Sequence, residues 1–222
     1  MGSSENIAII LLAAGASSRM GDTKQLLPWG KTTLLGHAIQ TAKDSAAQSV
    51  VVVLGANAKA IRKEIGDYSR DGTPTEEKPS RRNENGDNQA EFVENTDWQS
   101  GLGSSISCGI RYIQEKTLVY DAALVVLADQ PLIDTEYLNS MMESFVSTQN
   151  GIIATAYEKR AGVPALFSQS YFEKLQGLND DQGAQKIIND PDQAAFVLNP
   201  ENKTVDIDTK SEYHKLIERL NE

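Results

Sequence analysis

Four runs of apolar residues constrain the fold of this chain more than any other feature of its sequence. They cover residues 7–14, 50–54, 122–128 and, more weakly, 152–156. Continuous apolar runs, unlike alternating ones, are typical of strands that other elements cover on both faces. Between these strands, residues 33–46 and 106–114 repeat apolar side chains at helical spacing. Strands that alternate with helices predict an α/β fold with a mostly parallel sheet.

The composition fits one folded domain of ordinary enzyme size. The chain has 222 residues, of which 40% are hydrophobic and 23% charged, and these fractions are typical of globular proteins. We therefore expect residues 1–222 to form a single domain. The 21 basic and 31 acidic side chains give a formal net charge of −10, and a surface of that sign repels phosphate backbones and anionic lipids. Binding to nucleic acid or to a membrane is not expected.

Two further features bear on the compartment. Cys108 is the only cysteine, which excludes an internal disulfide and a cysteine-rich metal cluster and favours a reducing environment. The apolar run at residues 7–14 follows a segment without basic residues, so it is interpreted neither as a secretory signal nor as a membrane span. Both features favour a cytoplasmic location.

One stretch, residues 69–89, breaks the globular composition because it contains no hydrophobic residue. Such a stretch cannot contribute to a core, so it predicts an exposed loop inserted into the domain. Within it, Arg81 and Arg82 could grip a partner or a substrate. A solvated insertion without a role is the favoured interpretation, because composition alone marks this segment.

The segment after the first apolar run is the strongest indication of a binding site. In open parallel sheets, ligands bind beyond the carboxyl ends of the strands, and this loop leaves the first strand. Ala14 and Gly15 allow the backbone to approach a ligand closely, and Ser17 offers a hydroxyl. Arg19 and Lys24 supply the positive charge that several phosphate oxygens require. The loop is interpreted as a polyphosphate-binding loop; the alternative is a turn whose cations face water.

Two familiar nucleotide-binding motifs are excluded by spacing. A Walker A loop requires G-x-x-x-x-G-K-[ST], whereas five residues separate Gly15 from Gly21, and Asp22 follows. A dinucleotide-binding fingerprint requires G-x-G-x-x-G, and no glycine lies between Gly15 and Gly21. Neither a P-loop ATPase nor a nicotinamide-dependent dehydrogenase is supported.

A carboxylate is predicted to lie at the same edge of the sheet as this loop. Asp129 follows the apolar run at residues 122–128, and Pro131 keeps the chain out of helical geometry there. A carboxylate beside a polyphosphate is where Mg²⁺ is expected, because that ion prefers one or two carboxylates together with substrate phosphates. The alternative is that Asp129 caps a helix that starts near Thr135.

The second metal ligand is expected from residues 205–209. The alternation of this segment predicts a short strand with Asp206 and Asp208 on one face. Either carboxylate could complete the metal site, and Asp208 is favoured because it lies nearer to the end of the strand. Its alternative role is a local cap for the last helix, which Thr209 and Glu212 are predicted to open as a capping box.

At these residues the chain resembles the MobA-like NTP transferases, and within them most closely the molybdenum cofactor cytidylyltransferases. The first loop carries the family pattern LAAGxSSRMGxxK intact at residues 12–24. Four further motifs follow in family order, at residues 98–106, 127–131, 162–167 and 206–209. The likeness covers nearly the whole chain except the polar stretch.

The resemblance implies a three-layer α/β/α Rossmann-like nucleotidyltransferase fold and assigns roles to single residues. Arg19 and Lys24 would bind the triphosphate and act in catalysis. Asp129 and Asp208 would hold Mg²⁺. The remaining nucleotide contacts would come from Leu12, Ala13, Ala14, Gly15, Ser17, Gly101 and Ser105. Relatives that use GTP usually carry glycine at the position of Ala14, so the alanine favours CTP.

The implied activity is nucleotidyl transfer: a nucleoside monophosphate, with CMP favoured, passes from an NTP to a phosphate-bearing acceptor and pyrophosphate leaves. Molybdopterin or molybdenum cofactor is the expected acceptor, with a molybdoenzyme as a candidate partner. Residues 180–185 lack the first Gly and the Arg of the family's G-D-x-G-A-R segment, which leaves the acceptor open. The alternatives are a sugar-phosphate or methylerythritol-phosphate nucleotidyltransferase, and a non-catalytic chaperone that delivers cofactor to a molybdoenzyme.

Overall fold

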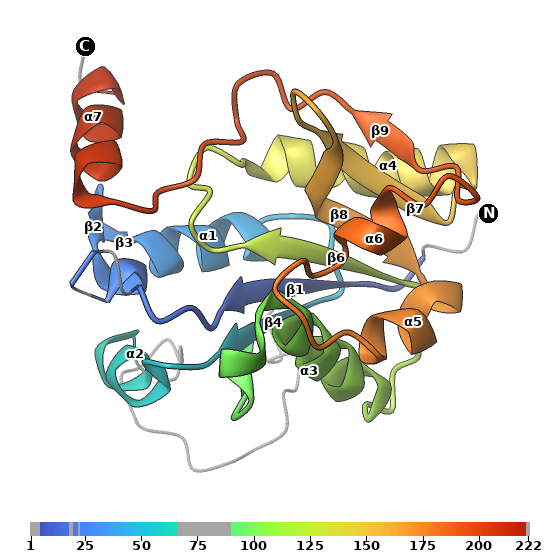
Figure 1. Ribbon diagram of the computed structural model, residues 1–222, viewed down its shortest axis with the longest axis horizontal. Coiled ribbons are helices and arrows are strands. Elements are labelled where there is room, and N and C mark those ends of the chain that lie inside the picture. Colours follow the sequence, from blue (N-terminus) through green and yellow to red (C-terminus); the bar gives the residue numbers. More distant parts are fainter. Residues whose placement is uncertain (1–4, 18–19, 22, 66–89, 221–222) are drawn as a thin grey trace.

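The computed structural model describes residues 5–17, 20–21, 23–65 and 90–220 of the chain (Figure 1). Its centre is a seven-stranded sheet with the strand order β5-β4-β1-β6-β8-β7-β9. In chain order the strands are β1 (Ile7–Ala13), β4 (Ser49–Leu54), β5 (Ala90–Glu94), β6 (Ala122–Leu127), β7 (Ile152–Ala156), β8 (Ala161–Ser168) and β9 (Phe196–Leu198). All run parallel except β8, which pairs antiparallel with β6 and β7. The predicted mostly parallel sheet is confirmed, and the four apolar runs form β1, β4, β6 and β7.

Helices cover both faces of this sheet and complete the three layers that the resemblance implied (Figure 1). The helices are α1 (Leu34–Lys43), α2 (Ala58–Ile65), α3 (Leu102–Gln114), α4 (Thr135–Thr148), α5 (Phe172–Gln176), α6 (Gln185–Ile188) and α7 (Lys210–Leu220). Ile9 and Leu11 of β1 pack in the cluster that includes α1, α2 and α4. Ile10 and Leu12 pack in the cluster that includes α3 and α5. Because both faces are covered, the strand is apolar at every position.

The predicted helices are confirmed with small shifts at their ends. Thr33 caps α1, and its side chain accepts a hydrogen bond from the Gly36 N–H at 3.0 Å. The helix expected at residues 106–114 begins earlier, at Leu102, where Gly101 with φ 99° turns the chain into α3. A short hairpin of β2 (Pro28–Trp29) and β3 (Thr32–Thr33) precedes α1. The insertion predicted at residues 69–89 lies outside the described residues.

The strand predicted at residues 205–209 is wrong. Residues 203–208 are irregular and do not pair in the sheet. The alternation of Asp and Ile arises instead because Ile207 is fully buried and its N–H donates to the Asp129 carbonyl at 3.0 Å. The capping box that follows is confirmed: Thr209 Oγ1 accepts from the Glu212 N–H, and Glu212 Oε2 accepts from the Thr209 N–H.

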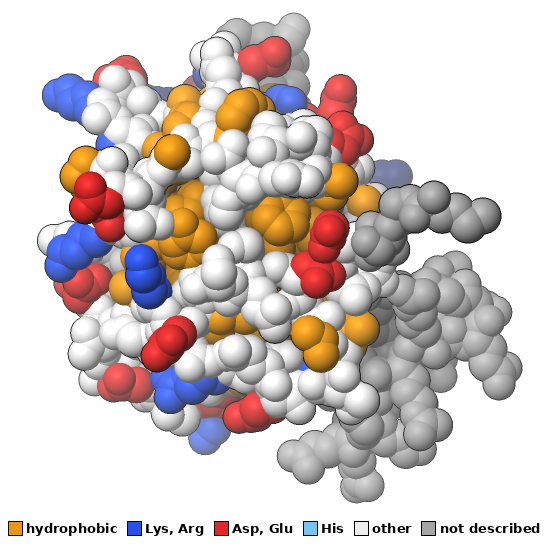
Figure 2. Space-filling view, turned by 90° about the vertical axis from the view of Figure 1, so that its right-hand side faces the viewer, with side chains coloured by type: hydrophobic (Ala, Val, Ile, Leu, Met, Phe, Trp, Pro, Cys, Tyr) orange, Lys and Arg blue, Asp and Glu red, His pale blue; other side chains and the backbone are white. Residues whose placement is uncertain are grey.

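The described residues leave both basic and acidic side chains on the surface. On the face that Figure 2 presents, basic and acidic side chains lie in scattered groups between apolar ones. No helix among the described residues is both long enough and apolar enough to cross a bilayer.

Candidate functional site

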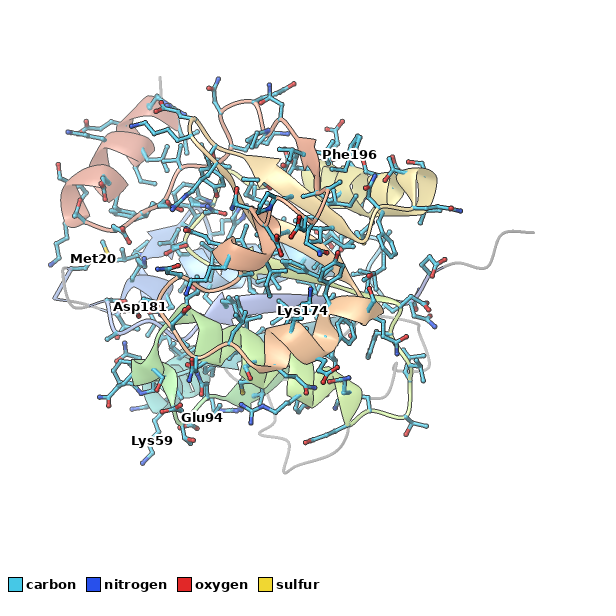
Figure 3. All side chains as sticks on the ribbon, turned by 45° about the vertical axis from the view of Figure 1, so that its right-hand side comes forward. Met20, Lys59, Glu94, Lys174, Asp181 and Phe196 are labelled. Atoms are coloured by element: carbon cyan, nitrogen blue, oxygen red, sulfur yellow. The ribbon has the colours of Figure 1, made fainter. Side chains whose placement is uncertain are left out.

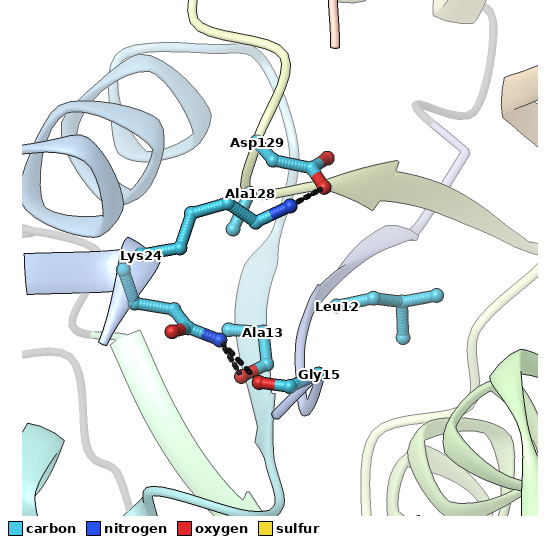
Figure 4. Close-up of a pocket in the computed structure, with 7 residues that line it drawn as sticks. Leu12, Ala13, Gly15, Lys24, Ala128 and Asp129 are labelled. Atoms are coloured by element: carbon cyan, nitrogen blue, oxygen red, sulfur yellow. Dashed lines mark hydrogen bonds and ion pairs between the residues drawn. The ribbon is translucent and has the colours of Figure 1, made fainter. Parts of the chain in front are cut away.

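The ammonium group of Lys24 lies between two carboxylates at the carboxyl edge of the sheet. Its Nζ donates to Asp129 Oδ2 at 2.6 Å, a bond drawn in Figure 4, and to Asp208 Oδ1 at 3.2 Å. Asp129 follows β6 and Asp208 precedes α7, so segments far apart in the chain meet here. Burial alone would lower the pKa of Lys24, but the charge of Asp129 and the hydrogen bonds to both carboxylates outweigh it and raise the pKa. Lys24 is therefore a positive charge throughout the neutral range.

The first loop bends sharply at Ser17, the start of its return toward Lys24. Ser17 has φ 56°, in the left-handed region that residues with a side chain seldom adopt. Its hydroxyl accepts a hydrogen bond from the Lys24 N–H at 3.1 Å and donates to Gln25 Oε1 at 3.2 Å. These two bonds offset the conformational cost at Ser17 and bring Lys24 to the end of β1.

Gln25 holds the loop from inside, a role that the sequence did not reveal. Its side chain is only 5% exposed, and Nε2 donates to the carbonyls of Ala13 at 3.0 Å and Gly15 at 2.9 Å, the pair of dashed lines in Figure 4. In a planar trans peptide the C=O and the next N–H point in opposite directions. The N–H groups of Ala14 and Ala16 therefore point away from Gln25, and backbone N–H groups in such a loop can bind anions.

The two carboxylates fit a divalent cation of the kind that binds together with phosphates. Asp129 Oδ1 is buried and has no hydrogen-bond partner among the described residues, so it retains an acceptor for a ligand. Mg²⁺ is satisfied by one or two carboxylates when substrate phosphates and water supply its other ligands. Three or more His, Cys, Asp and Glu side chains do not gather into an all-protein metal site anywhere in the described ranges.

Asp206, the other candidate ligand, faces a different partner. Its Oδ1 accepts a hydrogen bond from Gln130 Nε2 at 2.8 Å, and the same nitrogen donates to the Tyr157 hydroxyl at 2.8 Å. Burial raises the pKa of Tyr157 to about 12, so this hydroxyl keeps its proton, which it donates to the Val163 carbonyl. Gln130 and Tyr157 were also missed by the sequence analysis. They tie Asp206 to the ends of β6 and β7 and leave Asp208 for Lys24.

The two alternative roles as helix caps belong to neighbouring residues. Asp134 caps α4, because its Oδ1 accepts from the Tyr137 N–H at 2.8 Å. Asp129 is therefore not the cap of that helix. The acceptor at the start of α7 is Thr209 Oγ1, while the side chain of Asp208 pairs with Lys24.

Gly101 and Ser105 lie in a segment that contacts the first loop through Gly55. A methyl group added to Gly55 would meet the Ala14 carbonyl at 2.5 Å and the Trp98 Cβ at 2.8 Å, so only glycine allows this approach. Ser105 itself is buried, and its hydroxyl accepts a hydrogen bond from Asn95 Nδ2 at 3.1 Å. The structure thus brings the segment to the loop but turns the Ser105 side chain into the protein.

A pocket lies between the first loop and the pair formed by Lys24 and Asp129 (Figure 4). Its lining consists of Leu12, Ala13, Gly15, Lys24, Gln25, Ala128 and Asp129. Five of these were predicted site residues. Ala14 and Ser17 belong to the same loop, and Asp208 reaches the pocket through Lys24. Arg19 lies outside the described residues.

The fold and the pocket together define an α/β protein with a pocket beyond the carboxyl ends of its parallel strands, the position at which such sheets bind ligands. Residues 9–195 match the MobA-like NTP transferase domain. The chain belongs to this family, and it is therefore a nucleotidyltransferase. The resemblance on which the sequence analysis relied is confirmed.

Similar proteins carry several different names. Purine catabolism protein PucB of Bacillus subtilis is 28% identical over 212 residues, which cover 92% of each protein. Nicotine blue oxidoreductase of Paenarthrobacter nicotinovorans is 33% identical over 150 residues, which cover 66% of this chain and 59% of that protein. Crystal structures of Rv0371c from Mycobacterium tuberculosis superpose with TM-scores of 0.73 at 25% identity and, for a complex with manganese, 0.70 at 23% identity; each covers 96% of this chain and 98% of that chain.

Proposed function

We propose that this nucleotidyltransferase transfers CMP from CTP to the terminal phosphate of molybdopterin or molybdenum cofactor and releases pyrophosphate. The observation that carries the proposal is the position of Lys24. It lies beside two carboxylates and lines the same pocket as the first loop. Such a set of charges suits a triphosphate that arrives with a divalent cation. The nucleotide preference rests on Ala14 and the acceptor on the family resemblance.

The first loop would bind the nucleotide through its backbone. Gln25 orients the carbonyls of Ala13 and Gly15 inward, so that neighbouring N–H groups can donate to phosphate oxygens. Lys24, together with Arg19, would stabilise the charge that builds on the departing pyrophosphate. The acceptor phosphate is already anionic and needs no strong general base, so positioning and charge neutralisation supply the catalysis.

Asp129 and Asp208 would hold the divalent cation, for which we propose Mg²⁺. When bound, that ion neutralises phosphate charge during transfer. The free Oδ1 of Asp129 supports this assignment, and Rv0371c has been crystallised in complex with manganese. Asp208 is preferred to Asp206 as the second ligand because it shares Lys24 with Asp129, whereas Asp206 accepts a hydrogen bond from Gln130.

The organisation of the chain forms part of the same proposal. We assign residues 1–222 to one domain, supported by a sheet whose strands come from residues 7–198 and by a family match over residues 9–195. A cytoplasmic location fits the lone Cys108.

An assay of pyrophosphate release tests the proposal and its alternatives together. The purified chain would be given Mg²⁺ with CTP, GTP, UTP or ATP, and molybdopterin, molybdenum cofactor, a sugar phosphate or methylerythritol phosphate as acceptor. Mass spectrometry of the product identifies the transferred group. We expect release with CTP and a molybdopterin-type acceptor. CTP binding without release of pyrophosphate would instead favour the delivery chaperone. Release of pyrophosphate with a sugar phosphate or methylerythritol phosphate would favour nucleotidyl transfer to that acceptor.

A second assay tests for oxidoreductase activity, which the name of one similar protein suggests. Because a similar protein is called nicotine blue oxidoreductase, the same preparation would be mixed with nicotine blue and a nicotinamide reductant. We expect no turnover, since the first loop lacks a dinucleotide-binding fingerprint. Reduction of the dye in the absence of nucleotidyl transfer would overturn the proposed function.

A further inference from the structure

Lys24 occupies the charge position that a divalent cation would need. Its Nζ lies 2.6 Å from Asp129 Oδ2 and 3.2 Å from Asp208 Oδ1, the two carboxylates assigned to the metal. A cation bound to these two carboxylates, including one that used the Asp129 Oδ1 without a hydrogen-bond partner among the described residues, would lie beside the ammonium. It would then be close to a second positive charge in a partly buried site, where like charges repel more strongly than in water. Lys24 and the cation therefore compete for the same carboxylates.

When a nucleotide is present, the Lys24 ammonium can bind to its phosphates instead of to the two carboxylates. A lysine ammonium is a compact charge on a flexible four-carbon stem, and Lys24 lines the same pocket as Leu12 and Gly15 of the first loop. A triphosphate in that loop offers several anionic oxygens to the ammonium. Movement of Lys24 onto a phosphate would take the ammonium away from both carboxylates, and the phosphates would supply further ligands to the cation.

We propose that Lys24 acts as a placeholder cation that keeps the metal site closed until a nucleoside triphosphate arrives, so that the ligand of this site is the cation–nucleotide complex and not the free ion. This inference rests on the proposed function, because it takes Asp129 and Asp208 as the metal ligands. It adds that free Mg²⁺ or Mn²⁺ binds weakly and that nucleotide and cation bind with positive cooperativity. By thermodynamic linkage, each raises the affinity for the other by the same factor.

A substitution of Lys24 tests the inference directly. Removing this positive charge, although it is needed for catalysis, should strengthen metal binding. Mn²⁺ is the probe, and electron paramagnetic resonance of the free ion gives the dissociation constant. Without nucleotide, Lys24→Met should bind Mn²⁺ about tenfold more tightly than the unaltered protein, which lies within the usual range for the coupling of two binding events. With a CTP analogue that cannot be cleaved, the affinity of the unaltered protein should rise about tenfold and that of the variant much less.

The matched control is Lys174→Met, which changes the net charge equally. Lys174 is exposed on α5, which follows the carboxyl end of the antiparallel strand β8 and so lies at the opposite edge of the sheet (Figure 3). This variant should bind Mn²⁺ as the unaltered protein does. Adding Asp129→Asn to Lys24→Met should remove the gained affinity, which places the extra binding at these carboxylates.

Two results would overturn the inference. One is equal Mn²⁺ affinity in Lys24→Met and Lys174→Met; the other is an affinity of the unaltered protein that does not change with the CTP analogue. The second measurement needs no variant, so it can overturn the inference even if Lys24→Met fails to fold. Failure of the proposed function has a different signature, because it appears as absent pyrophosphate release whatever the Mn²⁺ affinities are.

Discussion

The two sides of the site are built in different ways. On the side of the first loop, one buried side chain, Gln25, bonds to Ala13, Gly15 and Ser17, all within twelve residues of it. On the acidic side, Asp208 arrives on an irregular segment that is held by the buried Ile207 and by a bond to the Asp129 carbonyl. The loop side is thus fixed by local hydrogen bonds and the acidic side by long-range packing. Substitutions on the loop side should therefore affect nucleotide binding, and substitutions on the acidic side should affect cation binding.

The largest effect is expected from Lys24→Met, because the ion pairs of Lys24 join the two sides. Loss of a charge that stabilises the departing pyrophosphate should lower kcat by a factor of about 10²–10³. The KM for CTP should change far less. Steady-state pyrophosphate release measures both constants, with Lys174→Met as the charge-matched control. A kcat within a few-fold of the unaltered enzyme would remove Lys24 from the catalytic assignment.

On the acidic side, Ile207→Ala most directly disrupts the packing that holds the segment of Asp208. Ile207 is fully buried and packs in a cluster with Met20, Leu34 and Leu216. Truncation of a large buried aliphatic side chain leaves a cavity and should lower the free energy of unfolding by about 2–4 kcal/mol. Guanidinium denaturation followed by circular dichroism gives this value.

A second measurement on Ile207→Ala separates its effect on the position of Asp208 from its effect on the free energy of unfolding. Val146→Ala on the exposed surface of α4 should change the free energy of unfolding by less than about 0.5 kcal/mol. At a temperature where Ile207→Ala is still folded, its Mn²⁺ affinity in the presence of nucleotide should fall, since Asp208 is no longer held in place. An undiminished affinity would show that the acidic side does not depend on this packing.

On the loop side, Gln25→Met keeps the side-chain volume but removes the donor to the buried Ala13 carbonyl and to the Gly15 carbonyl. The free energy of unfolding should fall by about 1–3 kcal/mol, and the KM for CTP should rise about tenfold while the KM for the acceptor stays constant. Ser107→Ala is the matched control, because its hydroxyl donates to the Gln176 carbonyl at the α3–α5 contact. A similar loss of stability in both variants, with no selective change in the KM for CTP, would reduce Gln25 to a structural role.

The contrast between the two sides also explains what the sequence could predict. The strands could be predicted because burial on both faces makes every position of β1 and β6, and every position of β4 after Ser49, apolar. The first loop could be predicted because Gly15, Arg19 and Lys24 follow the strand β1 directly. The sequence wrongly predicts a strand around Ile207, because a single buried residue between two aspartates has the same period as a strand. Gln25 and Gln130 carry no charge or pattern of their own, and only their partners in the folded chain give them a role.

The smallest effect is expected outside the pocket lining, from Asp134→Ala at the start of α4. Asp134 accepts from the Tyr137 N–H and pairs with Lys203 at 2.9 Å. Burial alone would raise the pKa of Asp134, but the hydrogen bonds from Lys203 and from the Tyr137 N–H outweigh it and lower the pKa. Loss of the cap should lower the free energy of unfolding by about 1 kcal/mol at pH 7, with no change in kcat.

The pH dependence of that difference has a definite sign. A carboxyl whose pKa is lower in the folded than in the unfolded state adds stability above the unfolded value, and this contribution is lost as the pH falls through the folded value. The difference between the unaltered protein and Asp134→Ala should therefore shrink as the pH falls below about 4. Asp134→Asn keeps an acceptor for the Tyr137 N–H but no charge, so its stability relative to Asp134→Ala should not vary over this range. Denaturation at pH 7 and pH 3 measures all three proteins, and a constant gap between the unaltered protein and Asp134→Ala would exclude the charge of Asp134 as its source.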